Sequence, residues 1–209
     1  MNSIFVREGG IEGFFKTSPV TSIIILLNTI MLLVTLVTGG FGSANLISLG
    51  ALNYQLIDAG EWYRLITAAF LHGSMIHFLS NTIIGLIVLS SGLERIIKSK
   101  KFLTIYLSSM VLSSLLVYGI DSFTGSVVPT IGASGAIFGA LGSLLFITVF
   151  RPDMLPERDI QSIRVIAIIN IVFTFLSPGI SIGGHVGGLL SGFLISFLLI
   201  RRNVFKVLH

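Results

Sequence analysis

The sequence predicts an all-α integral membrane protein in which six helices cross the bilayer. Three observations predict this class. Of the 209 residues, 53% are hydrophobic and only 11% are charged. The mean hydropathy is +0.98, and a soluble domain needs less apolar surface than this to fill its core. The apolar residues also gather into runs long enough to span a bilayer.

The six predicted spans cover residues 20–37, 76–93, 102–120, 132–150, 163–176 and 182–200. The run at 163–176 is the shortest and contains Asn170, so its length alone would also fit a re-entrant or buried segment. No repeat or linker divides the chain, and we expect a single membrane domain over 1–209. Its parts outside the spans include an amino-terminal segment, a long loop and a tail, at 1–18, 41–75 and 201–209.

The basic residues predict the orientation in the membrane. Of the 13 Lys and Arg residues, 12 fall in segments that six crossings place on one side, and Arg64 in the 41–75 loop is the exception. The positive-inside rule therefore places both termini in the cytoplasm. It also requires an even number of crossings between Arg164 and Arg201, so 163–176 must cross if 182–200 does. Topology explains the pI of about 9.7 better than nucleic-acid binding does.

Two residues are candidates for covalent chemistry. The chain has no cysteine, so another nucleophile is needed, and Ser134 stands in the segment IGASGAIFG at the outer end of the fourth span. Small neighbours let a second helix or a substrate come close there, although such a serine can also be an N-cap or a packing residue. His185, in GGHVGG, is an ionisable residue inside a span and so a functional candidate, although a single histidine can be structural.

Spacing predicts that these two residues lie at one depth. Ser134 precedes Arg151 by 17 residues, and His185 precedes Arg201 by 16. At about 1.5 Å per residue, both stand roughly 25 Å from the basic edge of a hydrocarbon core about 30 Å thick. Water must then reach them through an outward-facing cavity. Glycines at four-residue spacing would let the two spans approach closely: Gly135, Gly139, Gly184, Gly188 and Gly192.

The second span carries two further polar candidates. His77 and Asn81 are four residues apart, on one helical face, and they bracket the level of Ser134. They could donate hydrogen bonds to the oxyanion of a tetrahedral intermediate, or they could make a structural contact between helices. Four polar residues at matched depth favour a functional site. Because no Asp or Glu is near, a Ser-His dyad is predicted. No metal site is predicted, since His72 and His77 lack nearby acidic ligands.

Three motifs occur in order at these helix ends: His77-x-x-x-Asn81, Gly132-Ala-Ser134-Gly135 and Gly184-His185-x-x-Gly188-x-x-x-Gly192. Through them the chain resembles the rhomboid family of intramembrane serine proteases over nearly its whole length. The tetrapeptide EWYR, which ends at Arg64, and Glu94, which closes the second span, add to the resemblance. Two positions depart from the family pattern: Tyr63, where the pair is commonly Trp-Arg, and Lys98, where a glycine often follows the Glu94 motif.

The resemblance implies a rhomboid-like bundle that cleaves peptide bonds in or beside transmembrane segments, with no metal or organic cofactor. Ser134 would be the nucleophile and His185 the general base. The Ser134 backbone N–H, His77 and Asn81 would form the oxyanion hole, and Phe138 would pack against the histidine. Residues expected to pack the helices or contact substrate are Gly132, Gly135, Gly139, Gly188 and Gly192.

The expected partners are transmembrane protein substrates and the lipid bilayer, not nucleic acid, and no pattern indicates an oligomeric state. The expected location is a cell membrane, of the bacterial plasma membrane type, with the active site open to the extracytoplasmic side. Two other classes are alternatives. A catalytically inactive rhomboid relative would bind clients without cutting them, but both Ser134 and His185 are present. A small transporter would show inverted repeats and a midplane site, which the sequence lacks.

Overall fold

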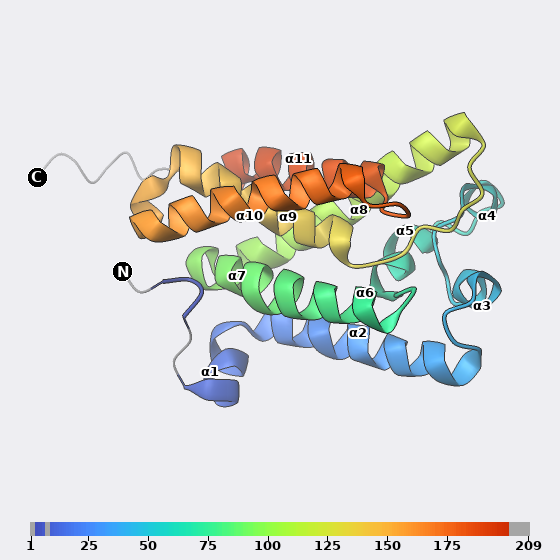
Figure 1. The fold of residues 1–209 in the computed structure, drawn as a ribbon, viewed down its shortest axis with the longest axis horizontal. Coiled ribbons are helices and arrows are strands. Elements are labelled where there is room, and N and C mark those ends of the chain that lie inside the picture. The colour runs from blue at the N-terminus through green and yellow to red at the C-terminus, as the bar shows by residue number, and fades with distance from the viewer. Residues whose placement is uncertain (1–2, 7–8, 201–209) are drawn as a thin grey trace, which may run out of the picture.

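The structure, a computed structural model, describes residues 3–6 and 9–200. Within these residues the chain forms six long helical segments. They run side by side along the molecule, and the first and last described segments lie at the same end (Figure 1). The crossing segments are α2 (Pro19–Thr38), then α6 (Met75–Ser80), η2 (Asn81–Ser90) and α7 (Ser91–Ile97) in succession, α8 (Ser99–Thr124), α9 (Ser134–Phe150), α10 (Glu157–Leu176) and α11 (Ile182–Leu199).

Five of these segments are long and apolar enough to cross a membrane, and α9 is a shorter apolar helix of 17 residues. The helical membrane fold predicted from the sequence is confirmed, and the chain is a multi-pass membrane protein. The relative lengths differ from the prediction, however. The weak fifth run belongs to the 20-residue α10, which starts at Glu157. Glu157 and Asp159 in its first turn suit a helix start, but the charged residues of the first two turns interrupt the apolar run.

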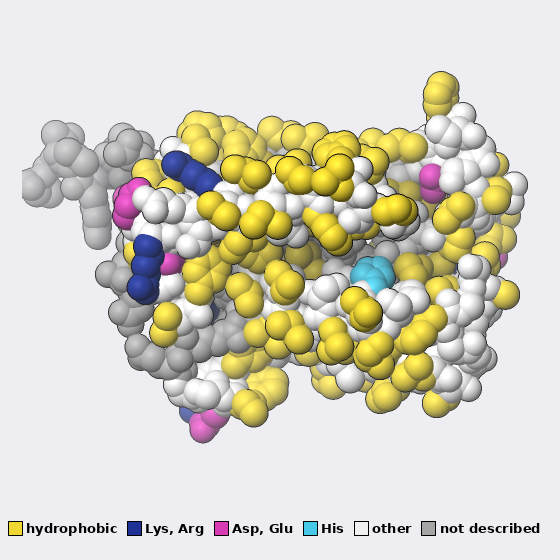
Figure 2. Space-filling view, viewed as in Figure 1, with side chains coloured by type: hydrophobic (Ala, Val, Ile, Leu, Met, Phe, Trp, Pro, Cys, Tyr) yellow, Lys and Arg dark blue, Asp and Glu magenta, His cyan; other side chains and the backbone are white. Residues whose placement is uncertain are grey.

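The helix α9 forms the centre of the bundle. Most of its side chains are buried, and it packs against α8, α11 and η2. Its apolar residues occur all round the helix, as expected for a segment without a solvent face. In contrast, α2 and α10 expose most of their apolar side chains, and Figure 2 shows hydrophobic side chains along the flanks with Lys and Arg at the left end. The apolar flanks are the surface that would face lipid.

The middle of the second crossing is a π-helix, η2, which the sequence did not predict. A π-helix is wider than an α-helix and often occurs at functional sites. Its buried residues recur in adjacent pairs every four positions: Asn81 with Thr82, Gly85 with Leu86, and Leu89 with Ser90. A Cβ atom added to Gly85 would lie 2.5 Å from Cδ1 of Ile137, so η2 lies directly against α9. The α-helical rise used to estimate depth does not hold along this stretch.

A buried carboxylate fastens the start of α2 to the end of α7. Glu94 is 1% exposed and accepts hydrogen bonds from the backbone N–H groups of Val20 and Thr21 at 3.0 and 2.9 Å. The hydroxyls of Thr21 and Ser99 each donate to it at 2.7 Å. The first N–H groups of a helix have no acceptor within the helix, so Glu94 supplies one from a neighbouring segment.

Replacing Glu94 with alanine should lower the free energy of unfolding by about 3 kcal/mol, because it leaves two buried and two half-buried donors without an acceptor. Thermal unfolding in detergent measures this loss. Glu12→Ala is the control, since the Glu12 carboxylate forms only an exposed ion pair with Lys16 and its removal should have no effect. Equal stability of the two variants would contradict the role given to Glu94.

The turn between α7 and α8 contains a strained residue. Lys98 has φ 73° and ψ 155°. Within 3–6 and 9–200, every other residue with positive φ is a glycine. This region of backbone conformation is essentially restricted to glycine, and another residue there costs about 1–3 kcal/mol. The backbone N–H of Lys98 donates to the Glu94 carbonyl at 2.8 Å, and this hydrogen bond helps to hold the residue in its strained conformation.

The 41–75 loop packs at the other end of the bundle through short helices. Its hub is the buried side chain of Arg64, which donates to the Glu61 carboxylate and to the carbonyls of Ile47 and Ala51 at 2.7, 2.7 and 2.8 Å. Hydrogen bonds from Tyr63 and Arg64 lower the pKa of Glu61. The short helices are α3 (Ser43–Ser48), α4 (Tyr54–Asp58), α5 (Arg64–Thr67) and η1 (Ala68–Phe70).

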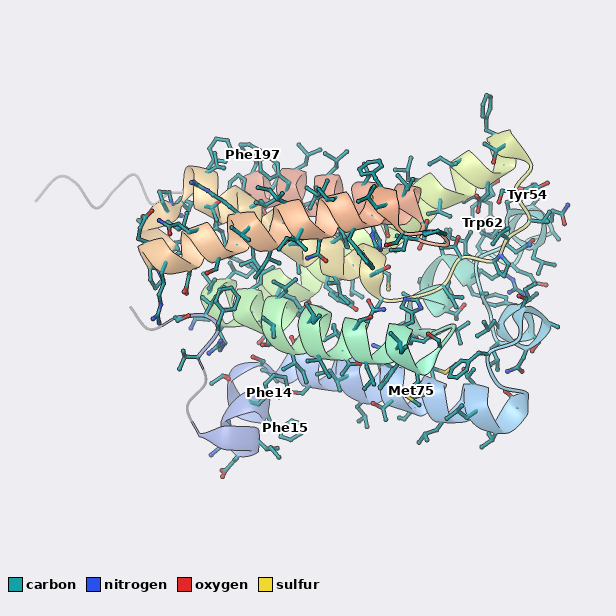
Figure 3. All side chains as sticks on the ribbon, in the orientation of Figure 1. Phe14, Phe15, Tyr54, Trp62, Met75 and Phe197 are labelled. Atoms are coloured by element: carbon teal, nitrogen blue, oxygen red, sulfur yellow. The ribbon has the colours of Figure 1, made fainter. Side chains whose placement is uncertain are left out.

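The same loop holds the segment that leads into α9. Leu52 and Thr130 exchange backbone hydrogen bonds of 3.0 Å, and the N–H of Gly132 donates to the carbonyl of Ala68 at 2.9 Å. Figure 3 shows Tyr54 and Trp62 of this loop at the end of the molecule opposite Phe14 and Phe15 of α1 (Gly10–Thr17). The loop therefore acts as a frame that fixes the backbone just before Ser134.

Candidate active site

Ser134 is the first residue of α9. Ala133 occupies the N-cap position, and no side chain caps this helix, so Ser134 does not serve as an N-cap. The backbone N–H groups in the first turn of a helix lack acceptors within the helix and carry partial positive charge. The Ser134 hydroxyl therefore stands beside donors that can stabilise a developing negative charge.

His77 and Ser134 line one notch. A Cβ atom added to Gly132 would lie 2.8 Å from Nε2 of His77 and 3.8 Å from Oγ of Ser134. The N–H of Gly73 donates to Nδ1 of His77 at 3.5 Å, a long hydrogen bond. In a neutral ring that accepts at Nδ1, the proton resides on Nε2, the nitrogen that faces the notch. Figure 2 shows histidine exposed in a furrow between the helices.

The other polar residues near His77 are buried. The Asn81 side chain donates from Nδ2 to the His77 carbonyl at 3.0 Å, which leaves the second N–H of the amide for another acceptor. The ring of His72 meets the rings of His77 and Phe78 edge-on, at 5.1 and 5.4 Å between centroids. Burial and the neighbouring His77 lower the pKa of His72 to about 3, so its ring is neutral at physiological pH. Sequence reasoning had not placed His72 beside the site.

His185 lies in the first turn of α11, which Ser181 caps by accepting from the Gly184 N–H at 3.1 Å. The ring of His185 is stacked on Phe138, with 3.9 Å between centroids and 20° between planes. Phe138 follows Ser134 by four residues and shares its face of α9. Within the described chain, no hydrogen bond joins Ser134 Oγ to His185. Catalytic hydrogen bonds are often long before substrate binds.

Thr174 of α10 is a partner of His185 that sequence reasoning missed. Its Oγ1 lies 2.8 Å from Nδ1 of His185, and its own hydroxyl donates to the Asn170 carbonyl at 2.7 Å. Thr174 is 2% exposed, whereas its neighbours in α10 are largely exposed. The signal in the sequence was the pair Asn170 and Thr174, two polar residues four positions apart in an apolar run. The prediction of a Ser-His dyad rested on the lack of Asp and Glu in the second, fourth and sixth spans and did not include a hydroxyl from the fifth.

Backbone contacts between glycines set the distance between α9 and α11. A Cβ atom added to Gly188 would collide with the Gly135 carbonyl, and one added to Gly192 would collide with the Gly139 carbonyl. The Gly184 carbonyl lies 3.6 Å from a Cβ atom added to Gly135. Since Gly135 follows Ser134 and Gly184 precedes His185, this close approach brings the two candidate residues to one level.

A small cavity of about 30 Å³ adjoins Ser134 on the side of α8, with Ser113, Gly132 and Ser181 among its lining residues. A cavity of this size can hold one or two water molecules, and hydroxyl and backbone groups in its wall offer the hydrogen bonds a water needs. No group of three or more His, Asp or Glu side chains suited to a metal ion occurs among the residues described.

Replacing Gly132 with alanine should lower turnover by about 100-fold, the scale of loss expected when a reacting group is misplaced by about 1 Å. Gly132 has φ +116° and its added Cβ would displace the His77 ring. Substrate cleavage by purified protein measures the effect. Gly60→Ala is the matched control, because Gly60 also has positive φ but has no neighbour within 4 Å of an added Cβ. An active Gly132→Ala protein would contradict the described notch.

The fold and the site together define a polytopic helical membrane protein with serine, histidine and asparagine side chains gathered at one end of its bundle. A family model described as Rhomboid domain matches residues 59–202. The chain therefore belongs to the rhomboid family, as its motifs indicated.

Several relatives are named rhomboid proteases. The chain is 37% identical to Rhomboid protease GluP of Bacillus subtilis (strain 168) over 166 residues, which are 79% of this chain and 32% of GluP. It is 28% identical to Putative rhomboid protease YdcA of the same organism over 183 residues, 87% of this chain and 89% of YdcA. Rhomboid protease AarA of Providencia stuartii is 31% identical over 144 residues, 62% of this chain and 50% of AarA. The chain thus spans about a third of the length of GluP and most of YdcA. These names support a peptidase.

Proposed function

We propose that this rhomboid-family chain is an intramembrane serine endopeptidase that cleaves peptide bonds in or near transmembrane segments of membrane proteins. The observation that carries the proposal is the stacking of His185 on Phe138, one helical turn beyond Ser134, where α9 and α11 touch through their glycine backbones. A hydroxyl and an imidazole at one level are the components that a serine nucleophile and its base require.

In the proposed reaction, Oγ of Ser134 attacks the carbonyl carbon of the scissile bond while Nε2 of His185 takes the hydroxyl proton. The backbone N–H of Ser134, Nε2–H of His77 and the second N–H of Asn81 donate to the resulting oxyanion. His185 then gives its proton to the departing amine as the carbon–nitrogen bond breaks, leaving an acyl group on Ser134. A water molecule hydrolyses this ester with His185 again as base, and the serine is regenerated.

Thr174 supports this assignment of the base. With the Thr174 hydroxyl donating to the Asn170 carbonyl, both contacts are satisfied when the Thr174 oxygen accepts from Nδ1–H of His185. The neutral ring then keeps its lone pair on Nε2, the nitrogen that a base in this position must present to Ser134. We assign Thr174 as a positioning residue, which does for His185 what a carboxylate does in a Ser-His-Asp triad.

Replacing Thr174 with valine, which keeps the shape but removes the acceptor, should lower kcat by about tenfold to 100-fold through misorientation of the base. KM should change little, because Thr174 would contact the histidine rather than the substrate. Thr174→Ser retains the hydroxyl and should restore most of the rate. A Thr174→Val protein with wild-type kcat would remove Thr174 from the site.

The orientation follows from the distribution of charge and is part of the proposal. We place the end of the bundle that carries Arg95, Lys98, Lys100 and Lys101 in the cytoplasm, together with the 1–18 and 201–209 segments. The site then opens to the extracytoplasmic side, and the 41–75 loop lies on that side. The bacterial origin of GluP, YdcA and AarA agrees with a plasma-membrane location. Residues 1–209 would form one membrane domain.

The test is to reconstitute the purified chain in liposomes with a fluorescent transmembrane substrate that contains helix-breaking residues near its outer end. Cleavage within the membrane segment or beside it is expected, since an unwound peptide bond is accessible to attack. Binding of the substrate without cleavage would instead indicate a catalytically inactive client-binding relative. Movement of a small solute across the liposome without any proteolysis would indicate a transporter.

A further inference from the structure

A second candidate site lies at the opposite end of α9 from Ser134. A hollow of about 340 Å³ opens among the ends of α7, α8, α9 and α11. Arg151, which follows the last residue of α9, lines it, so the hollow and Ser134 are separated by the 17-residue length of that helix. Its other lining residues are Ile96, Ile97, Lys98, Lys100, Lys101, Met154 and Ile200.

The rim of the hollow is cationic and its floor is apolar. Lys98, Lys100 and Lys101 are exposed, while Ile97 and Ile200 are buried beneath them. The guanidinium of Arg151 also lines the hollow and pairs with the Asp153 carboxylate at 2.9 Å. The three lysines alone therefore give the rim a surplus of positive charge next to apolar surface. An anionic group attached to a hydrocarbon chain complements both features.

The position of the hollow indicates where the hydrocarbon chain of such a ligand would come from. Because four apolar crossing segments end around it, the hollow lies at the level of the lipid headgroups. Leu103 and Leu107 continue the face of Lys100 along α8 and are exposed. A phospholipid could place its phosphate among the lysines and lay an acyl chain along these leucines. Basic pockets between helices at a membrane surface bind lipid headgroups in this way.

The backbone conformation of Lys98 is an independent observation that points to a ligand in this hollow. Its φ of 73° and ψ of 155° belong to a conformation that glycine adopts without strain. A lysine in such a conformation, with its side chain lining the hollow, keeps a positive charge there at the expense of stability. Strained residues of this kind cluster at sites where a ligand is held.

We propose that the hollow is a binding site for the phosphodiester of an anionic phospholipid from the surrounding bilayer, with Lys98, Lys100 and Lys101 as its ligands. The site is independent of the proteolytic reaction, since none of these residues belongs to the candidate active site. Free phosphate is also an anion but lacks the acyl chain that the apolar floor and the leucines of α8 would contact.

The test measures lipid binding to the purified full chain by native mass spectrometry, with phosphatidylglycerol, phosphatidylcholine and inorganic phosphate as separate probes. Wild type should retain phosphatidylglycerol in preference to the other two. Lys98→Ala should weaken phosphatidylglycerol binding roughly fivefold, the usual contribution of one lysine near an anionic surface. Lys98→Arg, which keeps the charge, should bind like wild type. Lys16→Ala, a lysine of α1 paired with Glu12, is the control and should also bind like wild type.

The Lys98→Gly variant separates a loss of lipid binding from a loss of folding, because it removes the charge and relieves the backbone strain at once. It should melt no lower than wild type and yet lose phosphatidylglycerol to the same extent as Lys98→Ala. Unchanged binding in both variants would overturn the proposal, as would an equal loss in Lys16→Ala, which would indicate only general attraction to a basic surface. Inorganic phosphate bound as tightly as phosphatidylglycerol would overturn the assignment to a lipid.

Discussion

Replacing Ser134 with alanine should lower the rate of substrate cleavage by about 10⁶-fold, the scale of loss in soluble serine proteases that lack their nucleophile. The hydroxyl is the only group in the proposed reaction that forms a covalent bond to the substrate, so no neighbour can replace it. Cleavage of a fluorescent transmembrane substrate in liposomes, followed over days for the slow variant, measures the effect.

The His185→Ala variant should lose about as much activity, and the double variant should be no slower than either single one, because residues that act as a unit are not additive. Ser143→Ala is the matched control. Ser143 lies on the same helix and is buried, but its hydroxyl contacts Ser196 rather than the site. If Ser134→Ala cleaved as fast as Ser143→Ala, Ser134 would not be the nucleophile.

Replacing Gly192 with leucine should lower the free energy of unfolding by more than about 3 kcal/mol, at or beyond the upper end of ordinary overpacking. A side chain at this position would meet the Gly139 carbonyl, and backbone cannot change rotamer to make room. The helices α9 and α11 would have to separate, which would also pull His185 away from Phe138. Thermal unfolding in detergent measures the loss of stability.

The matched control for this variant is Gly119→Leu on α8, where an added Cβ has no neighbour within 4 Å. Leucine also favours a helix over glycine, so this control should be as stable as wild type or more stable. If Gly192→Leu unfolded at the same temperature as Gly119→Leu, the packing of α9 against α11 would not depend on backbone contact.

The crossing helices were predictable because bilayer thickness imposes a length that apolar runs reveal directly. Charge counting resolved the weak run at 163–176, where hydropathy alone was ambiguous, and the structure extends it back to Glu157. The π-helix that begins at Asn81 was not predictable, since an apolar run of this length has the same composition in an α-helix. The arrangement of the 41–75 loop around Arg64 also depends on contacts remote in sequence.

The candidate site was predictable to the extent that its members carry unusual side chains for a membrane interior. Ser134, His185, His77 and Asn81 could all be named because polar groups at matched depth are conspicuous among apolar ones. Thr174 was missed, because a threonine can satisfy its hydroxyl within its own helix and so stands out little. Its proposed role rests on the distance to His185, which sequence spacing does not determine.

The most direct measurement of the central proposal is covalent labelling of the membrane-embedded protein with a fluorophosphonate, followed by mass spectrometry to locate the adduct. An activated serine attacks this phosphorus centre, whereas an ordinary hydroxyl in a membrane helix does not. We expect a single adduct on Ser134 that disappears in His185→Ala. An adduct on another residue, or labelling of Ser134 that persists without His185, would contradict a Ser134–His185 dyad.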